Sequence, residues 1–266
     1  ELCAFADEAA SGLKEQISAL KENGIKYLEL RSIDGQNVLS FTDDEVKKYS
    51  EALKNAGVEV WSIGSPVGKT DISVTEEDFL KDVSRAARIA KGFGAKRIRI
   101  FSFFNAYNSC RKVVDLLCKA VCLADKNGVK LCHENEKGIY GDNALRCEEI
   151  HRNFPELKAV FDPANFVQCG EDTIAAWKLL SPYVEYMHIK DALSDGTVVP
   201  AGKGNGNLPY LLSQYSGSVL TIEPHLSVFD GFSSLESGNN SKNDSFCYPN
   251  SRAAFDAAAY ALRTLL

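Results

Sequence analysis

The sequence contains no CxxC pair, no apolar run long enough to span a membrane and no signal-peptide pattern. Its eight cysteines are scattered. Cys118 and Cys122 lie four residues apart in a predicted helix, where they share a face rather than chelate a metal. We therefore expect reduced thiols, buried like small apolar side chains, in a reducing cytoplasmic setting.

An excess of basic residues is also missing. The chain has 30 Lys and Arg against 36 Asp and Glu, which gives a formal net charge of −6 at pH 7. Nucleic-acid-binding proteins usually carry a basic face, so this balance argues against a nucleic-acid partner, and no membrane partner is expected. The chain of 266 residues, 45% of them hydrophobic, is globular in composition and can bury a large core.

Apolar and amphipathic segments alternate regularly along the chain. Strands are predicted at 2–7, 25–31, 58–65, 95–104, 129–134, 157–162, 184–190 and 218–223. Helices are predicted at 10–23, 43–57, 75–94, 109–127, 143–153, 171–180, from about 208, and at 251–265. Eight such units are typical of a single (β/α)8 TIM barrel in the α/β class, with a doubly wound open sheet as the main alternative. We predict one barrel over 1–266, with a long loop at about 226–249 over its mouth.

Charged and polar residues follow the predicted strands, and in such barrels the chemistry lies where the strands end. Three of the four histidines belong to this set, whereas His151 lies in a helix and is expected at the surface. The strand ends deliver Asp7, Glu8, Glu29, Arg31, Ser65, Lys69, Arg97, Arg99, Ser102, His133, Glu134, Glu136, Asp162, Asn165, His188, Lys190, Asp191, Glu223 and His225.

The last four strands each supply at least one potential metal ligand. Together these ligands are Glu134, Asp162, His188 and Glu223. Three carboxylates and one imidazole suit one divalent ion, Mn²⁺ first, with Mg²⁺, Co²⁺ and Zn²⁺ as alternatives. The competing interpretation makes each residue a separate salt-bridge partner.

Five short segments carry a resemblance to a known family: HENEK (133–137), FDPANF (161–166), HIKD (188–191), AGKGNGNL (201–208) and IEPH (222–225). In this order and on these strands, the chain resembles the xylose-isomerase-like barrels known as sugar phosphate isomerases/epimerases, which include ketose 3-epimerases and inosose-processing enzymes. The resemblance extends over essentially the whole chain.

The resemblance implies roles for the residues that match. Glu134, Asp162, His188 and Glu223 correspond to the metal ligands of the epimerase branch, and Glu134 and Glu223 to the pair that exchanges protons with substrate carbon. This agrees with the chemistry, because proton abstraction next to a carbonyl needs a base and a cation that stabilises the enediolate. An epimerase also needs a second carboxylate to return the proton on the opposite face.

Other residues are expected to contact substrate, each with a rim salt bridge as the alternative. Asn165, where many relatives have His, is expected to donate a hydrogen bond to substrate or to a ligand carboxylate. His133 is expected to line the site or support a ligand. The remaining candidates are Glu136, Lys190 and His225, with Arg31, Arg99 and Lys137 as weaker ones.

The Gly-rich segment 201–208 leaves the phosphorylation of the substrate open. Its backbone N–H groups and Lys203 suit a phosphate cradle, and barrel phosphate sites favour the loops after the seventh and eighth strands. However, relatives that act on unphosphorylated sugars keep a Gly-rich loop here, often with an acidic residue at the position of Asn207.

These observations predict a divalent-metal-dependent sugar isomerase/epimerase that works through an enediolate. A lyase or dehydratase acting on a keto-sugar or inosose is the alternative, because it begins with the same proton abstraction. Remote alternatives are a non-catalytic sugar-binding barrel and an abasic-site endonuclease, which needs three zinc ions and more histidines. The expected partner is a small sugar or sugar derivative, and relatives often form dimers or tetramers, so a homo-oligomer is also possible.

Overall fold

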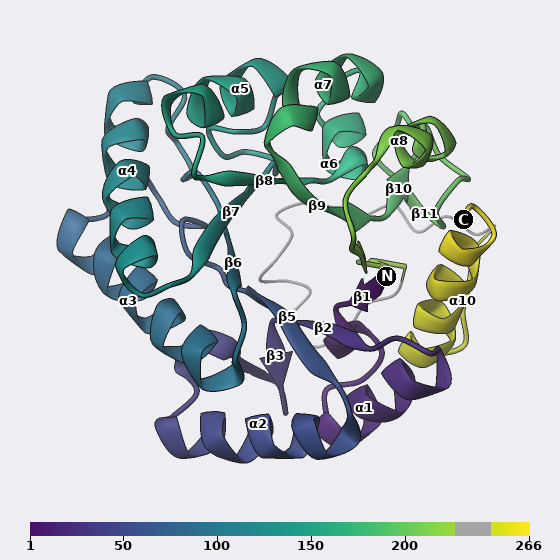
Figure 1. The fold of residues 1–266 in the computed structure, drawn as a ribbon. Coiled ribbons are helices and arrows are strands. Elements are labelled where there is room, and N and C mark those ends of the chain that lie inside the picture. The colour runs from purple at the N-terminus through teal and green to yellow at the C-terminus, as the bar shows by residue number, and fades with distance from the viewer. Residues whose placement is uncertain (227–245) are drawn as a thin grey trace.

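The computed structural model describes residues 1–226 and 246–266. Eight parallel strands close into a barrel in the order β1-β12-β9-β8-β7-β6-β5-β2, which confirms the predicted (β/α)8 fold (Figure 1). The strands are β1 (Leu2–Ala4), β2 (Tyr27–Leu30), β5 (Glu59–Gly64), β6 (Arg97–Ile100), β7 (Lys130–Glu134), β8 (Lys158–Phe161), β9 (Val184–Ile189) and β12 (Leu220–Ile222). Most of the predicted loop 226–249 lies outside the described residues.

An outer ring of helices surrounds the barrel (Figure 1). Its members are α1 (Leu13–Glu22), α2 (Asp43–Ala56), α3 (Glu76–Phe93), α4 (Cys110–Lys126), α5 (Ala144–Asn153), α7 (Thr173–Leu180), α8 (Leu208–Gln214) and α10 (Ser251–Arg263). Local signals set their ends: Thr42 and Glu45 form a capping box at the start of α2, and Gly57 ends that helix in the left-handed conformation. The helices lie where the sequence predicted them.

The strands are shorter than predicted, and several small elements were not predicted. Residues 101–104 leave the strand that was expected to continue to 104. The unpredicted elements are 3-10 turns η1 (Ala6–Glu8), η2 (Val38–Ser40) and η3 (Ser181–Tyr183), helix α6 (Pro163–Gln168), and two hairpins, β3–β4 (Ser32–Ile33, Gln36–Asn37) and β10–β11 (Asp191–Ala192, Val198–Val199). Segments this short carry too little periodicity to be recognised.

Successive strand residues point to opposite sides of the barrel wall. On β7, Leu131 joins the core between strands and helices, whereas Cys132 packs inside the barrel with Val160 and Tyr186. Glu134, two residues after Cys132, therefore also points inward. The same alternation brings the charged groups of the other strands to the barrel axis.

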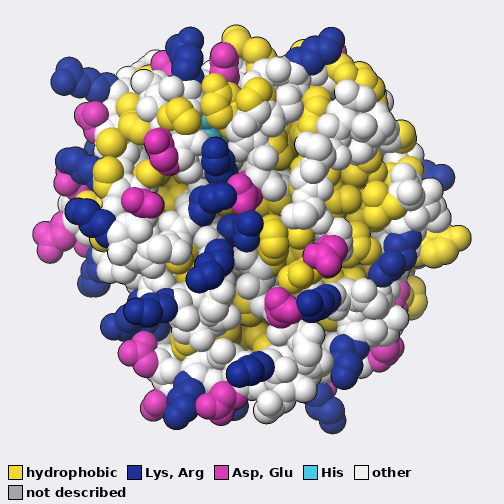
Figure 2. Space-filling view, in the orientation of Figure 1, with side chains coloured by type: hydrophobic (Ala, Val, Ile, Leu, Met, Phe, Trp, Pro, Cys, Tyr) yellow, Lys and Arg dark blue, Asp and Glu magenta, His cyan; other side chains and the backbone are white. Residues whose placement is uncertain are grey.

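Ion pairs lie at the end of the barrel where the strands begin. Arg97 Nε lies 2.8 Å from Glu185 Oε1, Lys130 Nζ lies 2.8 Å from Glu185 Oε2, and the Arg97 guanidinium lies 3.7 Å from the ring centre of Trp61. Figure 2, in the orientation of Figure 1, shows Lys and Arg side chains gathered near the middle of this face. Arg97 was expected at the functional end. That prediction was wrong, because Arg97 begins its strand and Arg99 lies nearer its end.

Two further expectations need correction. All eight cysteines lie in the described residues and all are free, but only Cys3, Cys132 and Cys147 are buried, and Cys122 and Cys247 are exposed. His151 is buried rather than at the surface, and its Nδ1 lies 2.9 Å from the Leu157 carbonyl oxygen. Within residues 1–226 and 246–266, no helix has the length and apolar character that a membrane crossing requires.

Candidate active site

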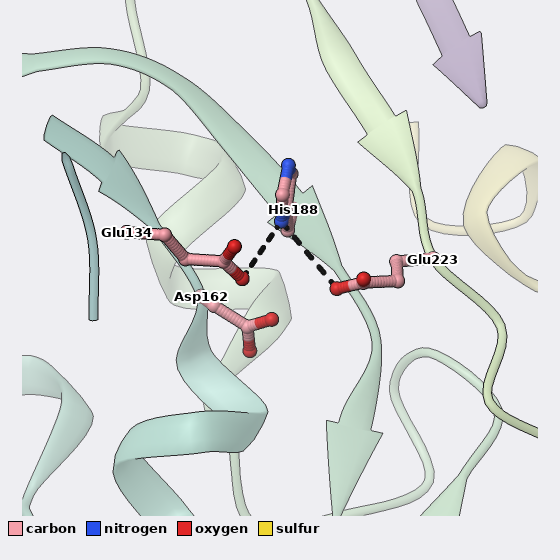
Figure 3. Close-up of side chains that lie close together, drawn as sticks. All are labelled: Glu134, Asp162, His188 and Glu223. Atoms are coloured by element: carbon pink, nitrogen blue, oxygen red, sulfur yellow. Dashed lines mark hydrogen bonds and ion pairs between the residues drawn. The ribbon is translucent and has the colours of Figure 1, made fainter. Parts of the chain in front are cut away.

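Four side chains meet inside the barrel at the end where the strands finish (Figure 3). Glu134 is the last residue of β7, Asp162 follows β8 and caps α6, His188 lies on β9, and Glu223 follows β12. Each offers one ligand atom, and these atoms lie within 4.8 Å of one another. All four residues are buried, so the predicted set is brought together on four neighbouring strands.

His188 holds the centre of this cluster. Its Nδ1 lies 2.9 Å from Glu134 Oε1 and 3.4 Å from Glu223 Oε2 (Figure 3). Burial acts to lower the pKa of His188, but Glu134, Glu29 and Glu223 outweigh it and hold that pKa well above its usual value. This raised pKa favours the protonated imidazole, with Nδ1 directed at the carboxylates of Glu134 and Glu223.

The carboxylates are ionised to different degrees. Burial acts to raise the pKa of Glu134, but His188 and Arg99 hold it at about 2. Glu223 has a strongly lowered pKa because Lys190, His225 and His188 likewise outweigh its burial. For Asp162 burial wins and raises the pKa to about 6, against the attraction of Lys190.

The cluster fits a divalent ion. Asp162 Oδ1 accepts a hydrogen bond from the Asn165 N–H, while Oδ2 lies 3.0 Å from Lys190 Nζ and accepts no hydrogen bond from the described residues. That buried oxygen, the oxygens of Glu134 and Glu223, and His188 Nδ1 make a mixed oxygen and nitrogen donor set for a hard to borderline cation. These four residues would hold the ion.

Glu29 fixes the other side of the His188 ring. Its Oε2 lies 3.1 Å from His188 Nε2, and its Oε1 accepts a hydrogen bond of 2.7 Å from the Tyr186 hydroxyl. All three residues are fully buried. A carboxylate at Nε2 keeps Nδ1 directed at the cluster and makes it a stronger ligand. Sequence reasoning placed Glu29 at a strand end but gave it no role, because its partner lies 159 residues away.

Replacing Glu29 by Gln is therefore expected to weaken Mn²⁺ binding by about 10- to 100-fold, because the amide orients His188 less firmly and withdraws the supporting charge. Titration calorimetry at pH 8 measures the affinity. Glu59→Gln, which removes an exposed carboxylate paired with Lys26, is the control and should bind Mn²⁺ as the wild type does. Equal affinities for the wild type and Glu29→Gln would remove Glu29 from the site.

Two buried arginines stand behind the two candidate acid/base carboxylates. Arg99 Nη1 donates to Glu134 Oε2 over 3.1 Å, and Arg31 Nη1 donates to Glu223 Oε1 over 3.4 Å. Both guanidinium groups lie over the ring of Phe5, at 5.2 and 4.4 Å from its centre. The arginines leave Glu134 Oε1 and Glu223 Oε2 directed toward His188.

Lys190 and His225, which were predicted to contact substrate, lie beside Glu223. Lys190 Nζ lies 3.0 Å from Glu223 Oε2, and His225 Nε2 lies 3.5 Å from Glu223 Oε1. The backbone of His225 has a φ of 46°, unusual for a residue with a side chain, and its N–H donates to Glu8 Oε2 over 2.6 Å. Glu8 thus fixes a strained backbone turn next to the site.

Other predicted residues support the site from further away. Asn165 Nδ2 donates to the Asn135 carbonyl oxygen over 2.9 Å and reaches Glu134 Oε1 at 3.4 Å, so it steadies a ligand carboxylate. Glu136 Oε2 lies 2.8 Å from Lys69 Nζ, and the backbone N–H of Lys137 donates to Glu136 Oε1. Glu136 and Lys137 lie in the loop after β7.

His133, a predicted substrate contact, points away from the cluster. It follows Cys132 and therefore faces the helices, where its Nε2 lies 2.9 Å from Ser102 Oγ. Ser102 Oγ also accepts the N–H of Gly141, and a Cβ at Gly141 would lie 2.5 Å from the His133 ring. His133 therefore supports β7 and the loop that follows it. We assign it a positioning role in place of the predicted contact with substrate.

Sequence similarity to a known protein family extends over most of the chain. The family model described as xylose isomerase-like TIM barrel matches residues 17–224. No curated protein shows significant sequence similarity to the chain.

Solved structures share the fold at low sequence identity. The protein described as IOLI with a bound zinc atom is 15% identical, with a TM-score of 0.75 and coverage of 100% of this chain and 97% of that one. The probable 3-DHS dehydratase AsbF from Bacillus anthracis is 15% identical, with a TM-score of 0.73 and 98% coverage of both chains. A D-tagatose 3-epimerase-like protein is 15% identical, with a TM-score of 0.66 and coverage of 84% and 90%. At this identity the likeness concerns the fold.

Proposed function

The chain belongs to the xylose isomerase-like TIM barrel family, and from that premise we propose that it is a divalent-metal-dependent sugar isomerase or epimerase. The observation that carries the proposal is the buried cluster of three carboxylates and one imidazole at the ends of β7, β8, β9 and β12. Mn²⁺ is the proposed ion, since carboxylate-rich sites with one imidazole suit it.

Glu134 and Glu223 are the proposed acid/base pair. Both are held as carboxylates, the form that accepts a proton from carbon, so the member that returns a proton to the opposite face must first take one up. They come from β7 and from the end of β12, which are separated in the barrel by β8 and β9, so a substrate carbon between them would meet one on each face. A bound divalent ion supplies stabilisation of the negative charge that develops on the substrate carbonyl oxygen.

Lys190, His225 and Arg99 are proposed to bind substrate oxygens next to this pair. Each lies within 4.0 Å of a Glu223 oxygen, so a hydroxyl group near Glu223 is within reach of fixed donors. The burial of these groups excludes water and strengthens each charge interaction. The positioning role of Asn165 and His133 follows from their contacts described above.

A lyase or dehydratase is the second candidate. Its first step is the same proton abstraction, and it differs only if a neighbouring hydroxyl group leaves before the proton returns. The structural likeness to a probable 3-DHS dehydratase supports keeping this candidate. The cytoplasmic setting, the small-molecule sugar partner and homo-oligomer formation expected from the sequence stay predictions.

Proton exchange tests the proposal. In D₂O, the Mn²⁺-loaded protein is expected to remove the NMR signal of a C–H next to the carbonyl of one member of a panel of free ketoses, ketose phosphates, inososes and 3-keto-glycosides. The products then separate epimerase, isomerase and lyase. Chelator-treated protein is the control and should exchange nothing. A metal-loaded protein that exchanges no compound of the panel would count against proton-transfer chemistry.

A further inference from the structure

The Gly-rich loop closes around a carboxylate of the protein itself. Asp191 follows Lys190, and both of its oxygens accept backbone N–H groups. Oδ1 accepts from Ala192 at 2.9 Å and from Gly206 at 2.8 Å, and Oδ2 accepts from Gly202 at 3.0 Å and from Gly204 at 2.9 Å. Four converging N–H groups are the arrangement that usually binds an external anion.

Two of the three glycines of this loop, Gly204 and Gly206, are explained by the same carboxylate. A Cβ at Gly204 would lie 2.4 Å from Asp191 Oδ1 and 2.5 Å from the Ala192 carbonyl oxygen. A Cβ at Gly206 would lie 2.7 Å from Asp191 Oδ1. Glycine is therefore required for close approach to Asp191, without any ligand. Lys203 is exposed, and its backbone N–H donates to Pro200.

The charges around the site also disfavour a dianion. The network of buried ion pairs that includes the cluster brings six carboxylates against three fixed cations, with the histidines left out of the count. The carboxylates are Asp7, Glu8, Glu29, Glu134, Asp162 and Glu223, and the cations are Arg31, Arg99 and Lys190. A divalent ion changes this sum from −3 to −1, and each of the three cations already has a carboxylate partner. A phosphate group would enter a site that is negative.

We propose that Asp191 is the built-in anion of loop 201–207 and that the substrate is a sugar or cyclitol derivative without a phosphate group. This inference rests on the proposed function and narrows its substrate class. Asp191 is a positioning residue: it holds the loop next to Lys190, with its own carboxylate in the place that a phosphate would take.

The first test compares matched pairs, each a free keto-sugar or keto-cyclitol and its monophosphate, in D₂O exchange by the Mn²⁺-loaded protein. The unphosphorylated member is expected to have a kcat/KM at least about 10-fold higher, since the four backbone N–H groups that would hold a phosphate already donate to Asp191. An equal or higher value for the monophosphate overturns the inference and leaves the proposed reaction standing. Exchange of neither member contradicts the proposed reaction, and the substrate class is then decided by the titration below.

The second test titrates inorganic phosphate into the Mn²⁺-loaded wild type and two variants by calorimetry. Asp191→Ser frees the four N–H groups and is expected to gain saturable phosphate binding. Asp195→Ser removes an exposed carboxylate from the turn of the β10–β11 hairpin, whose first strand holds Asp191. Like the wild type, this variant should show no saturable phosphate binding. If Asp191→Ser does not fold, the wild type decides: saturable binding below about 1 mM overturns the inference, and its absence supports it.

Discussion

Replacing Glu134 by Gln is expected to lower turnover at least about 1,000-fold. General base catalysis alone contributes about 10²- to 10⁴-fold, and this carboxylate is also a proposed ligand of the ion. Gln keeps the shape of Glu134 but cannot accept the substrate proton. It also leaves Arg99 and His188 with one negative partner fewer. Initial rates with the substrate found by proton exchange measure the effect.

Glu185→Gln provides a matched control for Glu134→Gln. It removes a carboxylate from a comparable double ion pair, with Arg97 and Lys130, at the opposite end of the barrel. Its turnover is expected to stay within about twofold of the wild type, because surface-accessible pairs contribute little and the site is remote. Thermal unfolding of both variants separates a folding defect from a chemical one. Full activity of a folded Glu134→Gln protein would refute the proposed mechanism.

Removing the divalent ion is expected to abolish turnover, and one equivalent of Mn²⁺ per chain should restore it. Binding is expected to release about one proton per ion at pH 7, because His188 must lose the proton that its raised pKa retains. Below pH 6 Asp162 must also lose its proton, since its pKa is about 6. The slope of log affinity against pH should therefore rise from about 1 above pH 6 to about 2 below it.

Calorimetry in buffers of different ionisation enthalpy measures both the affinity and the protons released. The stability of the metal-free protein gives an independent check on Asp162. A carboxyl group whose pKa rises from 3.8 to about 6 on folding stabilises the fold at low pH, and this contribution disappears as the pH rises through 6. Asp162→Asn should lose this pH dependence. Mn²⁺ affinity that is independent of pH between 5 and 8 would show that these two groups are not ligands.

The meeting of the four proposed metal ligands could be predicted because each lies at or near the end of a recognisable strand, and parallel strands in a barrel end at the same side. The direction of a side chain was the harder question. His133 and Glu134 are neighbours in sequence, yet the alternation along β7 sends one to the helices and the other to the axis. Applying that alternation from Cys132 onward would have assigned both residues correctly.

Long-range partners lay beyond sequence reasoning. Glu29 and His188 belong to strands that are far apart in the chain, and no local pattern indicates that their side chains meet across the barrel. The Gly-rich loop was ambiguous for a similar reason. Glycines that make room for a ligand and glycines that make room for Asp191 look the same in a sequence, and only the positions of the N–H groups distinguish them.

The ion pairs of Glu185 with Arg97 and Lys130 have a kinetic consequence. They lie at the end of the barrel where the strands begin, and Cys132, Val160 and Tyr186 pack inside the barrel between them and the cluster. Among the described residues the barrel interior on that side of the cluster is filled, so substrate should approach from the end where the strands finish. Substrate and product would occupy the same position at the cluster, so product should act as a competitive inhibitor of the substrate.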